Sequence, residues 1–199
     1  MKNTFWNDRY SAEDYAYGKG PNLFFKEQID KLTPGKILLL GEGEGRNAVY
    51  AAKIGWKVTA VDFSEQAKTK ALALAKENNV SIEYIVSNLG EYKFPINEFD
   101  NVSLVYIHVP SDIREKILSS VILSLKKGGT VIAEVFNKKQ IENNTGGPKE
   151  IDNLYSLDDF KKHLGNLRTE IFSEFTIELT EGKFHNGKSD IIRFVGFLD

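Results

Sequence analysis

The sequence predicts an α/β fold whose sheet is mostly parallel and ends in an antiparallel hairpin. Short apolar runs alternate with helix-like segments between residues 36 and 136, and this alternation favours right-handed crossovers between parallel strands. After residue 166, two long runs rich in β-branched and aromatic residues flank the turn-like HNGK at residues 185–188. Strands joined by such a short turn are antiparallel. No linker-like stretch divides the 199 residues, so we expect a single domain over residues 1–199.

The first predicted elements are a covering helix and a strand-helix-strand unit. In GPNLFFKEQIDKL, Pro21 can open a helix and Leu23 begins its apolar side. The apolar run KILLLG at residues 36–41 predicts a strand buried on both faces. The helix that follows can end at Gly55, and the β-branched run KVTAVD at residues 57–62 predicts the next strand.

The same alternation continues along the chain. Ser64 can cap the next helix, and the glycine pair at residues 128–129 can end a later one. The remaining elements are expected as strands at residues 81–87, 99–109 and 130–136 and as helices at residues 65–79, 111–129 and 157–164.

Composition limits the classes of partner. Cysteine is absent, which excludes disulfides, thiolate metal sites and a cysteine nucleophile, and we expect no metal site. The formal net charge is −2 without a cluster of Lys and Arg, which argues against a nucleic acid as ligand. No apolar run approaches the ~20 residues of a membrane span, and the N-terminus lacks a signal-peptide pattern. We therefore expect a cytoplasmic protein with a small-molecule ligand and no membrane partner; its oligomeric state is not indicated.

The loop GEGEG at residues 41–45 is the expected ligand site, because ligands of open parallel sheets bind beyond the carboxyl ends of the strands. A P-loop would require Lys and Ser or Thr where this chain has Arg46 and Asn47. The dinucleotide fingerprint fits Gly41 and Gly43, but its third glycine is replaced by Arg46. A glutamate about 5 Å from a phosphate charge would also cost about 3 kcal/mol. The loop therefore favours a cationic ligand without phosphate.

S-Adenosylmethionine has these properties, because it carries a sulfonium cation and no phosphate. Glycines let the backbone approach such a ligand closely. Asp62 ends the second strand about 20 residues after the loop, where a carboxylate can accept hydrogen bonds from ribose hydroxyls. Two simpler interpretations stay open: the loop as a tight turn without a ligand, and Asp62 as the N-cap of the helix that begins near Glu65.

Several motifs together resemble the class I S-adenosylmethionine-dependent methyltransferases, and more narrowly their tellurite-resistance and thiopurine-type branch. They are WNDRYS, YAYGKGPN, LLLGEGEGRNAVYAA, VTAVDFSEQAKTKA, LKKGGTVIAEVF, TGGP, LYS and EGKFHNGK, which together span almost the whole chain. The resemblance implies a three-layer, Rossmann-like, seven-stranded sheet with helices on both faces and an antiparallel C-terminal strand. It also implies three parts: a lid and covering helix at residues 1–34, a cofactor-binding core at 35–137, and a substrate-side loop and hairpin at 138–199.

The resemblance further implies a cofactor, S-adenosylmethionine, and the residues that line its site. These are Gly41, Glu42, Gly43 and Arg46 at the methionine end, Asp62 at the ribose, and Phe63, Ser64, Asn88 and Leu89 on the adenine side. Two positions depart from the family pattern. Leu39 stands where an acidic residue is common, and Asn88 stands where an aspartate is expected beside adenine. Both changes remove a charge, so the resemblance leaves the affinity for the cofactor open.

The acceptor of the methyl group decides whether a general base is needed, because only an acceptor with a proton to lose profits from one. His108, at the end of the strand at residues 99–109, and His185, in the expected hairpin turn, are the candidate catalytic residues; a purely structural role is the alternative for each. We expect a small-molecule acceptor, with a thiol or a tellurium or selenium oxyanion as examples. An NAD(P)-dependent oxidoreductase and a non-catalytic S-adenosylmethionine-binding module are the alternative functions.

Two further segments are expected to lie near the ligand. The aromatic residues of the front segment, which can form a lid with cation–π contacts to a sulfonium, are Trp6, Tyr10, Tyr15 and Tyr17. Arg9 and Lys19 in the same segment can attract an anionic acceptor. The composition of NNTGGPK at residues 143–149 predicts a mobile loop that can gate the substrate.

Overall fold

A computed structural model describes residues 3–199, so residues 1–2 of the expected lid lie outside the described residues. The strands are β1 (Lys36–Leu40), β2 (Lys57–Asp62), β3 (Glu83–Val86), β4 (Phe99–Val105), β5 (Leu125–Phe136), β6 (Arg168–Glu181) and β7 (His185–Phe197). The helices are α1 (Asn3–Tyr10), α2 (Leu23–Ile29), α3 (Arg46–Lys53), α4 (Glu65–Glu77), α5 (Ser111–Ser124) and α6 (Leu157–Leu164), with short 3-10 helices η1 (Lys138–Glu142) and η2 (Ile151–Asn153).

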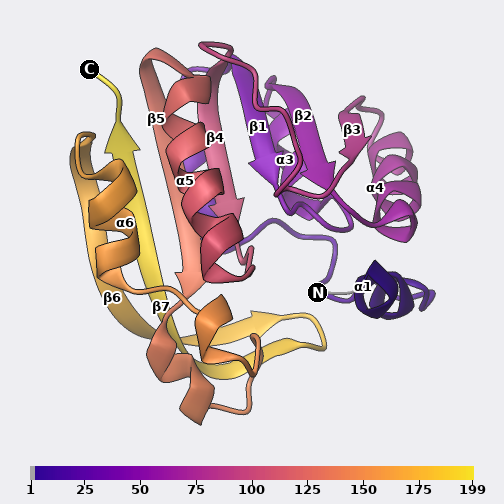
Figure 1. The fold of residues 1–199 in the computed structure, drawn as a ribbon. Helices are drawn as coiled ribbons and strands as arrows, with labels where there is room; N and C mark the ends of the chain where they lie inside the picture. Colours follow the sequence, from indigo (N-terminus) through magenta and orange to yellow (C-terminus); the bar gives the residue numbers. More distant parts are fainter. Residues whose placement is uncertain (1–2) are drawn as a thin grey trace.

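The strands form one sheet in the order β3-β2-β1-β4-β5-β7-β6. Strands β1 to β5 are parallel to one another, whereas β7 is antiparallel to both β5 and β6. Figure 1 shows β7 pointing back between β5 and β6. The direction of winding reverses between β1 and β4, so the carboxyl ends of these two strands mark the switch point of the sheet. The predicted seven-stranded, mostly parallel sheet with an antiparallel C-terminal strand is confirmed.

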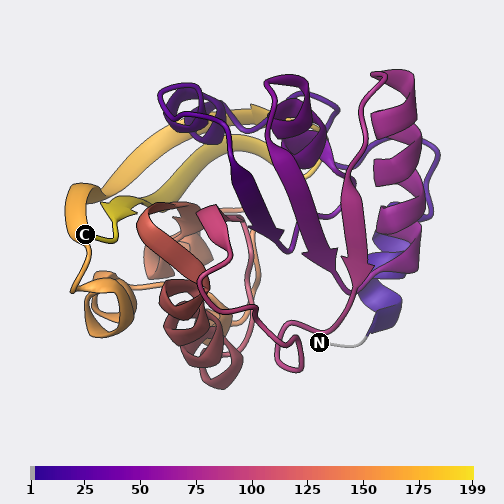
Figure 2. The same ribbon diagram turned by 90° about the horizontal axis from the view of Figure 1, so that it is seen from above.

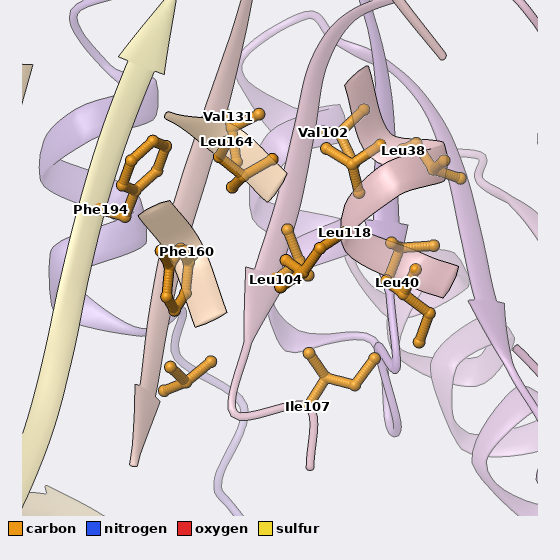
Figure 3. Close-up of a cluster of buried hydrophobic side chains, with 14 of the residues drawn as sticks. Leu38, Leu40, Val102, Leu104, Ile107, Leu118, Val131, Phe160, Leu164 and Phe194 are labelled. Carbon is orange, nitrogen blue, oxygen red and sulfur yellow. The ribbon is translucent and has the colours of Figure 1, made fainter. Parts of the chain in front are cut away.

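Helices α5 and α6 cover one face of the sheet and build the larger hydrophobic core (Figure 1). In Figure 3, Leu38 and Leu40 of β1 lie beside Leu118 of α5, and Phe160 of α6 lies beside Phe194 of β7. All five side chains are almost completely buried. Each buried side chain of this size stabilises the fold by about 1.5–3 kcal/mol.

Helices α2, α3 and α4 cover the opposite face, and Figure 2 shows helices on both sides of the sheet. Ile37 and Leu39 of β1 belong to this second core, whereas Leu38 and Leu40 belong to the first. The alternation follows from the two-residue period of a strand. The uninterrupted apolar run of β1 therefore has a physical cause: both of its faces are covered, as the sequence predicts.

Helix α2 begins two residues later than Pro21 and presents a different face from the predicted one. Asn22 is its N-cap, and the Asn22 Oδ1 accepts a hydrogen bond of 2.8 Å from the amide of Phe25. Leu23 is 72% exposed, whereas Phe24 and Phe25 are buried in the second core. The expectation that Leu23 lies on the buried side was wrong, because the cap fixes the start of the helix and thereby the direction in which each side chain points.

The turn of the C-terminal hairpin also differs from the prediction. It lies at residues 182–184, since Glu181 of β6 pairs directly with His185 of β7. Gly182 has φ of +68°, and a Cβ there would lie 2.6 Å from the backbone of Ala16 and Tyr17. Contact with the N-terminal segment therefore selects this turn over HNGK. As a consequence, His185 is the first residue of a strand and not a turn residue.

Replacement of Gly45 by alanine is expected to lower the free energy of unfolding by about 2–5 kcal/mol. Gly45 is the N-cap of α3 with φ of +87°, and an added Cβ would lie 2.6 Å from the Cβ of Ala71 in α4. The change therefore combines a left-handed backbone with overpacking between two helices. Urea denaturation measures the loss.

Gly128 provides the matched control, because its φ is +79° but nothing lies within 4 Å of an added Cβ. Gly128→Ala is expected to lower the free energy of unfolding only by the cost of a left-handed backbone conformation, about 1–2 kcal/mol. If the free energy of unfolding falls equally in the two variants, the close approach of α3 to α4 at Gly45 does not contribute to the effect of the substitution.

Candidate cofactor and substrate site

A cavity of about 1040 Å³ opens at the carboxyl ends of β1, β2, β4 and β5. It lies at the switch point of the sheet, where ligands of this architecture bind. Helix α1 and residues 17–18 form one wall, residues 147–150 another, and the start of β7 a third. The volume is at the upper end of that of small-molecule sites, about 300–1,000 Å³, so there is room for a nucleoside-sized ligand together with a second molecule.

The turn between β1 and α3 forms the base of the cavity. Gly41 and Gly43 both line it and both have φ of +61°, a conformation that residues with a Cβ rarely adopt. A Cβ on Gly41 would lie 3.2 Å from Ile107, and one on Gly43 would lie 2.8 Å from the Tyr10 hydroxyl. The glycines are therefore required by the backbone and by the close approach of α1, and they leave the turn accessible from the cavity.

The two glutamates of this turn have separate partners. The Glu42 Oε1 accepts hydrogen bonds from the amides of Asn47 (2.9 Å) and Ala48 (2.7 Å) at the start of α3. Burial, opposed by these bonds, raises the pKa of Glu42 to about 7. Glu44 accepts a bond from the amide of Ala16 and pairs with Lys70. Because Glu42 occupies amides that a phosphate would use, the helix start is a poor phosphate site.

Asp62, at the end of β2, completes the wall beside the turn. Its Oδ2 accepts a hydrogen bond from the amide of Gly43 and its Oδ1 accepts one from the amide of Ser64, each of 3.0 Å. Burial, opposed by these bonds, raises the pKa of Asp62 to about 6. Each carboxylate oxygen keeps a further lone pair for a hydroxyl in the cavity. Ser64 is the residue that caps α4, through a bond to the amide of Ala67, so the N-cap interpretation of Asp62 was wrong.

The expected adenine side is assembled from β2 and the loop after β3. Phe63, Asn88 and Leu89 all line the cavity. The Asn88 Oδ1 accepts a hydrogen bond of 3.0 Å from the amide of Gly90, which fixes the loop locally. Ser64, in contrast, is fully buried at the N-cap of α4 and is not part of the cavity wall. The structure thus brings three of these four predicted residues to the cavity.

His108 lines the cavity but has both ring nitrogens engaged by the backbone. Its Nε2 accepts a hydrogen bond of 3.0 Å from the amide of Phe136, so its Nδ1 carries the proton and donates to the carbonyl of Tyr106 at 2.9 Å. Burial lowers the pKa of His108 to about 3. The structure corrects the prediction of His108 as a general base, because no nitrogen is left to accept a proton and the ring instead joins β4 to β5.

His185 has a different environment, beside an ion pair. Glu181 and Arg46 are paired at 2.7 Å, and the His185 Nδ1 lies 3.8 Å from the same Glu181 oxygen. That distance is too long for a hydrogen bond but short enough for the carboxylate to stabilise a positive ring. Burial, assisted by Arg46 and opposed by Glu181, lowers the pKa of His185. The ring is therefore neutral near pH 7, and His185 lines the cavity.

The sequence did not single out Glu181 or a buried polar network next to it. Glu134 of β5 accepts hydrogen bonds from the Tyr106 hydroxyl (2.8 Å) and from the Asn22 side chain (2.6 Å), and it pairs with Arg193 of β7 at 2.7 Å. Asn22 also donates to Glu181 at 2.9 Å. Isolated charges inside apolar runs, such as Glu134 in TVIAEVF, are the signal by which this network could have been found.

The remaining predicted segments lie partly at the cavity. The aromatic residues Trp6, Tyr10 and Tyr17 line it, whereas Tyr15 bonds to the carbonyl of Lys70 outside it. Lys19 pairs with Glu77 on the surface and does not reach the cavity. Contacts to β7, such as that between Thr145 and the carbonyl of Lys188, hold the loop that the sequence predicts as a gate. Its mobility remains a prediction.

Comparison with known proteins agrees with this geometry. Residues 37–129 match the family model described as a methyltransferase domain. The match covers just under half of the 199 residues. It includes the glycine turn, Asp62 and both strands of the switch point. The cofactor of such a domain is S-adenosyl-L-methionine, and the phosphate-free turn with its buried carboxylates fits that cofactor.

Three known proteins illustrate the similarity of this chain to methyltransferases. A protein of Geobacillus sp. (strain WCH70) that is named as a methyltransferase is 33% identical over 112 residues, which cover 54% of this chain and 44% of that protein. TehB from Haemophilus influenzae has a TM-score of 0.73 at 14% identity, covering 99% of this chain and 67% of that chain. Phosphoethanolamine N-methyltransferase 2 from Haemonchus contortus, in complex with S-adenosyl-L-methionine, has a TM-score of 0.69 at 18% identity, covering 99% and 57%.

These similarities have different weight. At such low identities, the two solved structures show a shared fold alone. The chain spans less than half of the length of the curated relatives it matches.

Within residues 3–199, no helix is both long and apolar enough to cross a membrane, and no cluster of His, Cys, Asp and Glu has the arrangement of a metal site.

Proposed function

We propose that the protein is an S-adenosylmethionine-dependent methyltransferase that acts on a small molecule. The observation that carries this proposal is the occupation of the first α3 amides by Glu42 beside a glycine turn that faces the cavity. A ligand with phosphates would lose those amides and face a carboxylate. A sulfonium cation gains from the same carboxylate. This arrangement disfavours the nicotinamide-dependent alternative.

The three parts of the chain have distinct roles in this proposal. Residues 35–137 bind the cofactor, with Gly41, Glu42 and Gly43 at its methionine end and Asp62 at its ribose. Residues 1–34 cover the cavity through α1 and exclude water from it. Residues 138–199 form the acceptor side.

The adenosyl part of the cofactor would lie against β2 and the loop after β3. Phe63 and Leu89 offer apolar surface for the adenine ring, and Asn88 offers an amide for its edge, all on the cavity wall. Arg46, which is paired with Glu181 and lines the cavity, would lie at the methionine end of the cofactor. Ser64 acts indirectly, because its amide holds Asp62 in position.

Proton removal is assigned to His185. When bound, S-adenosylmethionine supplies a methyl carbon activated by a positively charged sulfur. An acceptor with an N–H, O–H or S–H must in addition lose its proton, and His185 is neutral, buried and at the cavity wall. Glu181 stabilises the imidazolium that forms, and Arg46 holds Glu181 in place.

The acceptor is proposed to be a thiol or a tellurium or selenium oxyanion, as in the tellurite-resistance and thiopurine-type branch. The resemblance of the front and C-terminal motifs to that branch supports this assignment, and the similarity in fold to TehB over 99% of the chain agrees with it. A cytoplasmic location belongs to the same proposal. A methyl-donor turnover screen over thiols, selenium and tellurium oxyanions and small carboxylates tests it; absence of any turnover would favour a binding module without catalysis.

The cofactor assignment predicts a pH-dependent preference between two ligands that differ by one charge. S-Adenosylmethionine carries the sulfonium and S-adenosylhomocysteine does not. Glu42, with a pKa of about 7, and Asp62, with a pKa of about 6, become negative as the pH rises through these values. The affinity for the cation relative to the neutral product is therefore expected to rise between about pH 5.5 and 8, by at most tenfold per pH unit for each proton released.

Calorimetric titration of both ligands at several pH values, with NADH as a third ligand, measures this preference. The neutral product serves as the control, because it has the same adenosyl and amino acid groups. If the ratio of the affinities for the two adenosyl ligands does not change with pH, the buried carboxylates do not interact with the sulfonium. Tight binding of NADH without binding of either adenosyl ligand would overturn the proposed function.

A further inference from the structure

Arg9 of α1 lies at the cavity wall in an aromatic environment. Its Nη1 donates a hydrogen bond of 3.0 Å to the Tyr17 hydroxyl. Its guanidinium carbon lies 4.2 Å from the ring centroid of Phe184 and 4.8 Å from that of Phe5. These rings hold the guanidinium in place and limit its contact with water. A guanidinium has five N–H donors, and Tyr17 accepts from only one of its nitrogens.

The other positive charges at the cavity have partners. Arg46 is paired with Glu181 at 2.7 Å, and both side chains are only 10% exposed. Lys149 donates to the Asn143 carbonyl and the Asn144 side chain in its own exposed loop. Arg9, in contrast, makes no ion pair with any carboxylate of residues 3–199. Arg9 and Lys149 are thus the arginine and lysine side chains at the cavity that have no acidic partner among the described residues, and Arg9 is the less exposed of the two.

The buried carboxylates at the cavity cannot fill this role without losing their own donors. Glu42 accepts from two amides of α3, Asp62 accepts from two amides of its own turn, and Glu44 pairs with Lys70. The positive charge of Arg9 is consequently available to an anion that enters the cavity. A carboxylate suits it, because a planar guanidinium binds a carboxylate through two parallel hydrogen bonds.

We propose that Arg9 binds the carboxylate at the amino acid end of the cofactor and thereby ties α1 over the occupied cavity. This inference rests on the proposed function, which supplies a ligand with that carboxylate. The usual alternative donors are taken, since the α3 amides serve Glu42 and Arg46 serves Glu181. An anionic methyl acceptor would offer the Arg9 guanidinium a negatively charged group as well. Comparing ligands with and without the cofactor carboxylate distinguishes these two possible partners of Arg9.

The test is a cycle of two ligands and two proteins, measured by calorimetry on the full chain. The ligands are S-adenosylmethionine and decarboxylated S-adenosylmethionine, which lacks only the carboxylate. The wild type is expected to bind the first about 10- to 100-fold more tightly. Arg9→Ala is expected to bind the two within about threefold of each other, because the loss of the arginine and the loss of the carboxylate remove the same interaction.

Lys19→Ala is the matched control, since it removes a positive charge from the same segment but Lys19 pairs with Glu77 away from the cavity. This variant is expected to keep the wild-type preference. If circular dichroism shows that Arg9→Ala does not fold, Arg9→Gln is titrated under the same criterion.

Each other outcome overturns the inference in a distinct way. If Arg9→Ala keeps the wild-type preference for the carboxylate, Arg9 does not bind it; a raised KM for anionic acceptors alone would then assign the anion to the acceptor. If the wild type binds both ligands equally, the inference fails while the proposed function stands. If the wild type binds neither, the proposed function itself fails.

Discussion

Replacing His185 by asparagine is expected to lower kcat by about 100- to 10,000-fold for an acceptor that loses a proton, because the change removes the general base. His185 lies in the cavity wall with its Nδ1 turned towards Glu181 at 3.8 Å. Burial holds its pKa below 6.5, so the ring can accept a proton at neutral pH. Steady-state kinetics measure the loss, and the Kd for S-adenosylhomocysteine is expected to stay unchanged.

The pH dependence of the activity shows whether His185 acts as a general base or only contributes to the wall of the cavity. Activity is expected to rise with pH through the pKa of His185 and to level off above about pH 6.5. The Glu181 carboxylate raises the pKa of His185, so Glu181→Gln is expected to move this acid limb to lower pH. The control is His163→Asn, because His163 bonds to Ser119 on the α5–α6 face. Activity of His185→Asn within about threefold of the wild type would contradict the assignment.

The architecture follows from patterns that are local in the sequence. The apolar run of β1 and the β-branched run of β2 each form a strand within one residue of the predicted bounds. The predictions failed where a distant contact decides the outcome. The helix expected over residues 111–129 ends at Ser124, because Leu125 already pairs with Phe99 of β4. Contact with residues 16–17 likewise moves the hairpin turn to Gly182.

The candidate site likewise contains residues that local sequence patterns predict and residues whose roles depend on distant contacts. The glycine turn and Asp62 are predictable, because a strand end followed by glycines and an acidic strand end are local signals. The network around His185 is not, since apart from Glu181, four residues earlier, its members come from distant parts of the chain. Asn22 and Glu181, for example, bond to each other across 159 residues. The structural role of His108 depends on the amide of Phe136, which no feature of the surrounding sequence YIHVP indicates.

Asp62→Asn is expected to weaken the binding of S-adenosylhomocysteine by about 10- to 100-fold, since each hydrogen bond from a hydroxyl to a carboxylate contributes about 1.5–3 kcal/mol. The amide also cannot accept from both Gly43 and Ser64 as the carboxylate does, so the turn itself loses one bond. Asp62→Ala removes all of these acceptors and is expected to abolish measurable binding. Calorimetric titration of both variants measures the two effects.

The stability of Asp62→Asn supplies an independent check on the same carboxylate. Its pKa of about 6 lies above that of an unfolded aspartate, about 3.9, so the folded wild type binds the proton more strongly. The stability of the wild type relative to Asp62→Asn is therefore expected to fall as the pH rises from about 4 to 6. Urea denaturation at both pH values measures this difference.

A matched control separates the ribose contact from the loss of a backbone acceptor. Asp100 also accepts a hydrogen bond from a backbone amide, that of Lys36 at 2.7 Å, but at the opposite end of the parallel strands. Asp100→Asn is expected to change stability without changing the Kd for S-adenosylhomocysteine. If Asp62→Asn and Asp100→Asn weaken binding equally, Asp62 acts only by supporting the fold; if Asp62→Asn binds as the wild type does, the ribose lies elsewhere in the cavity.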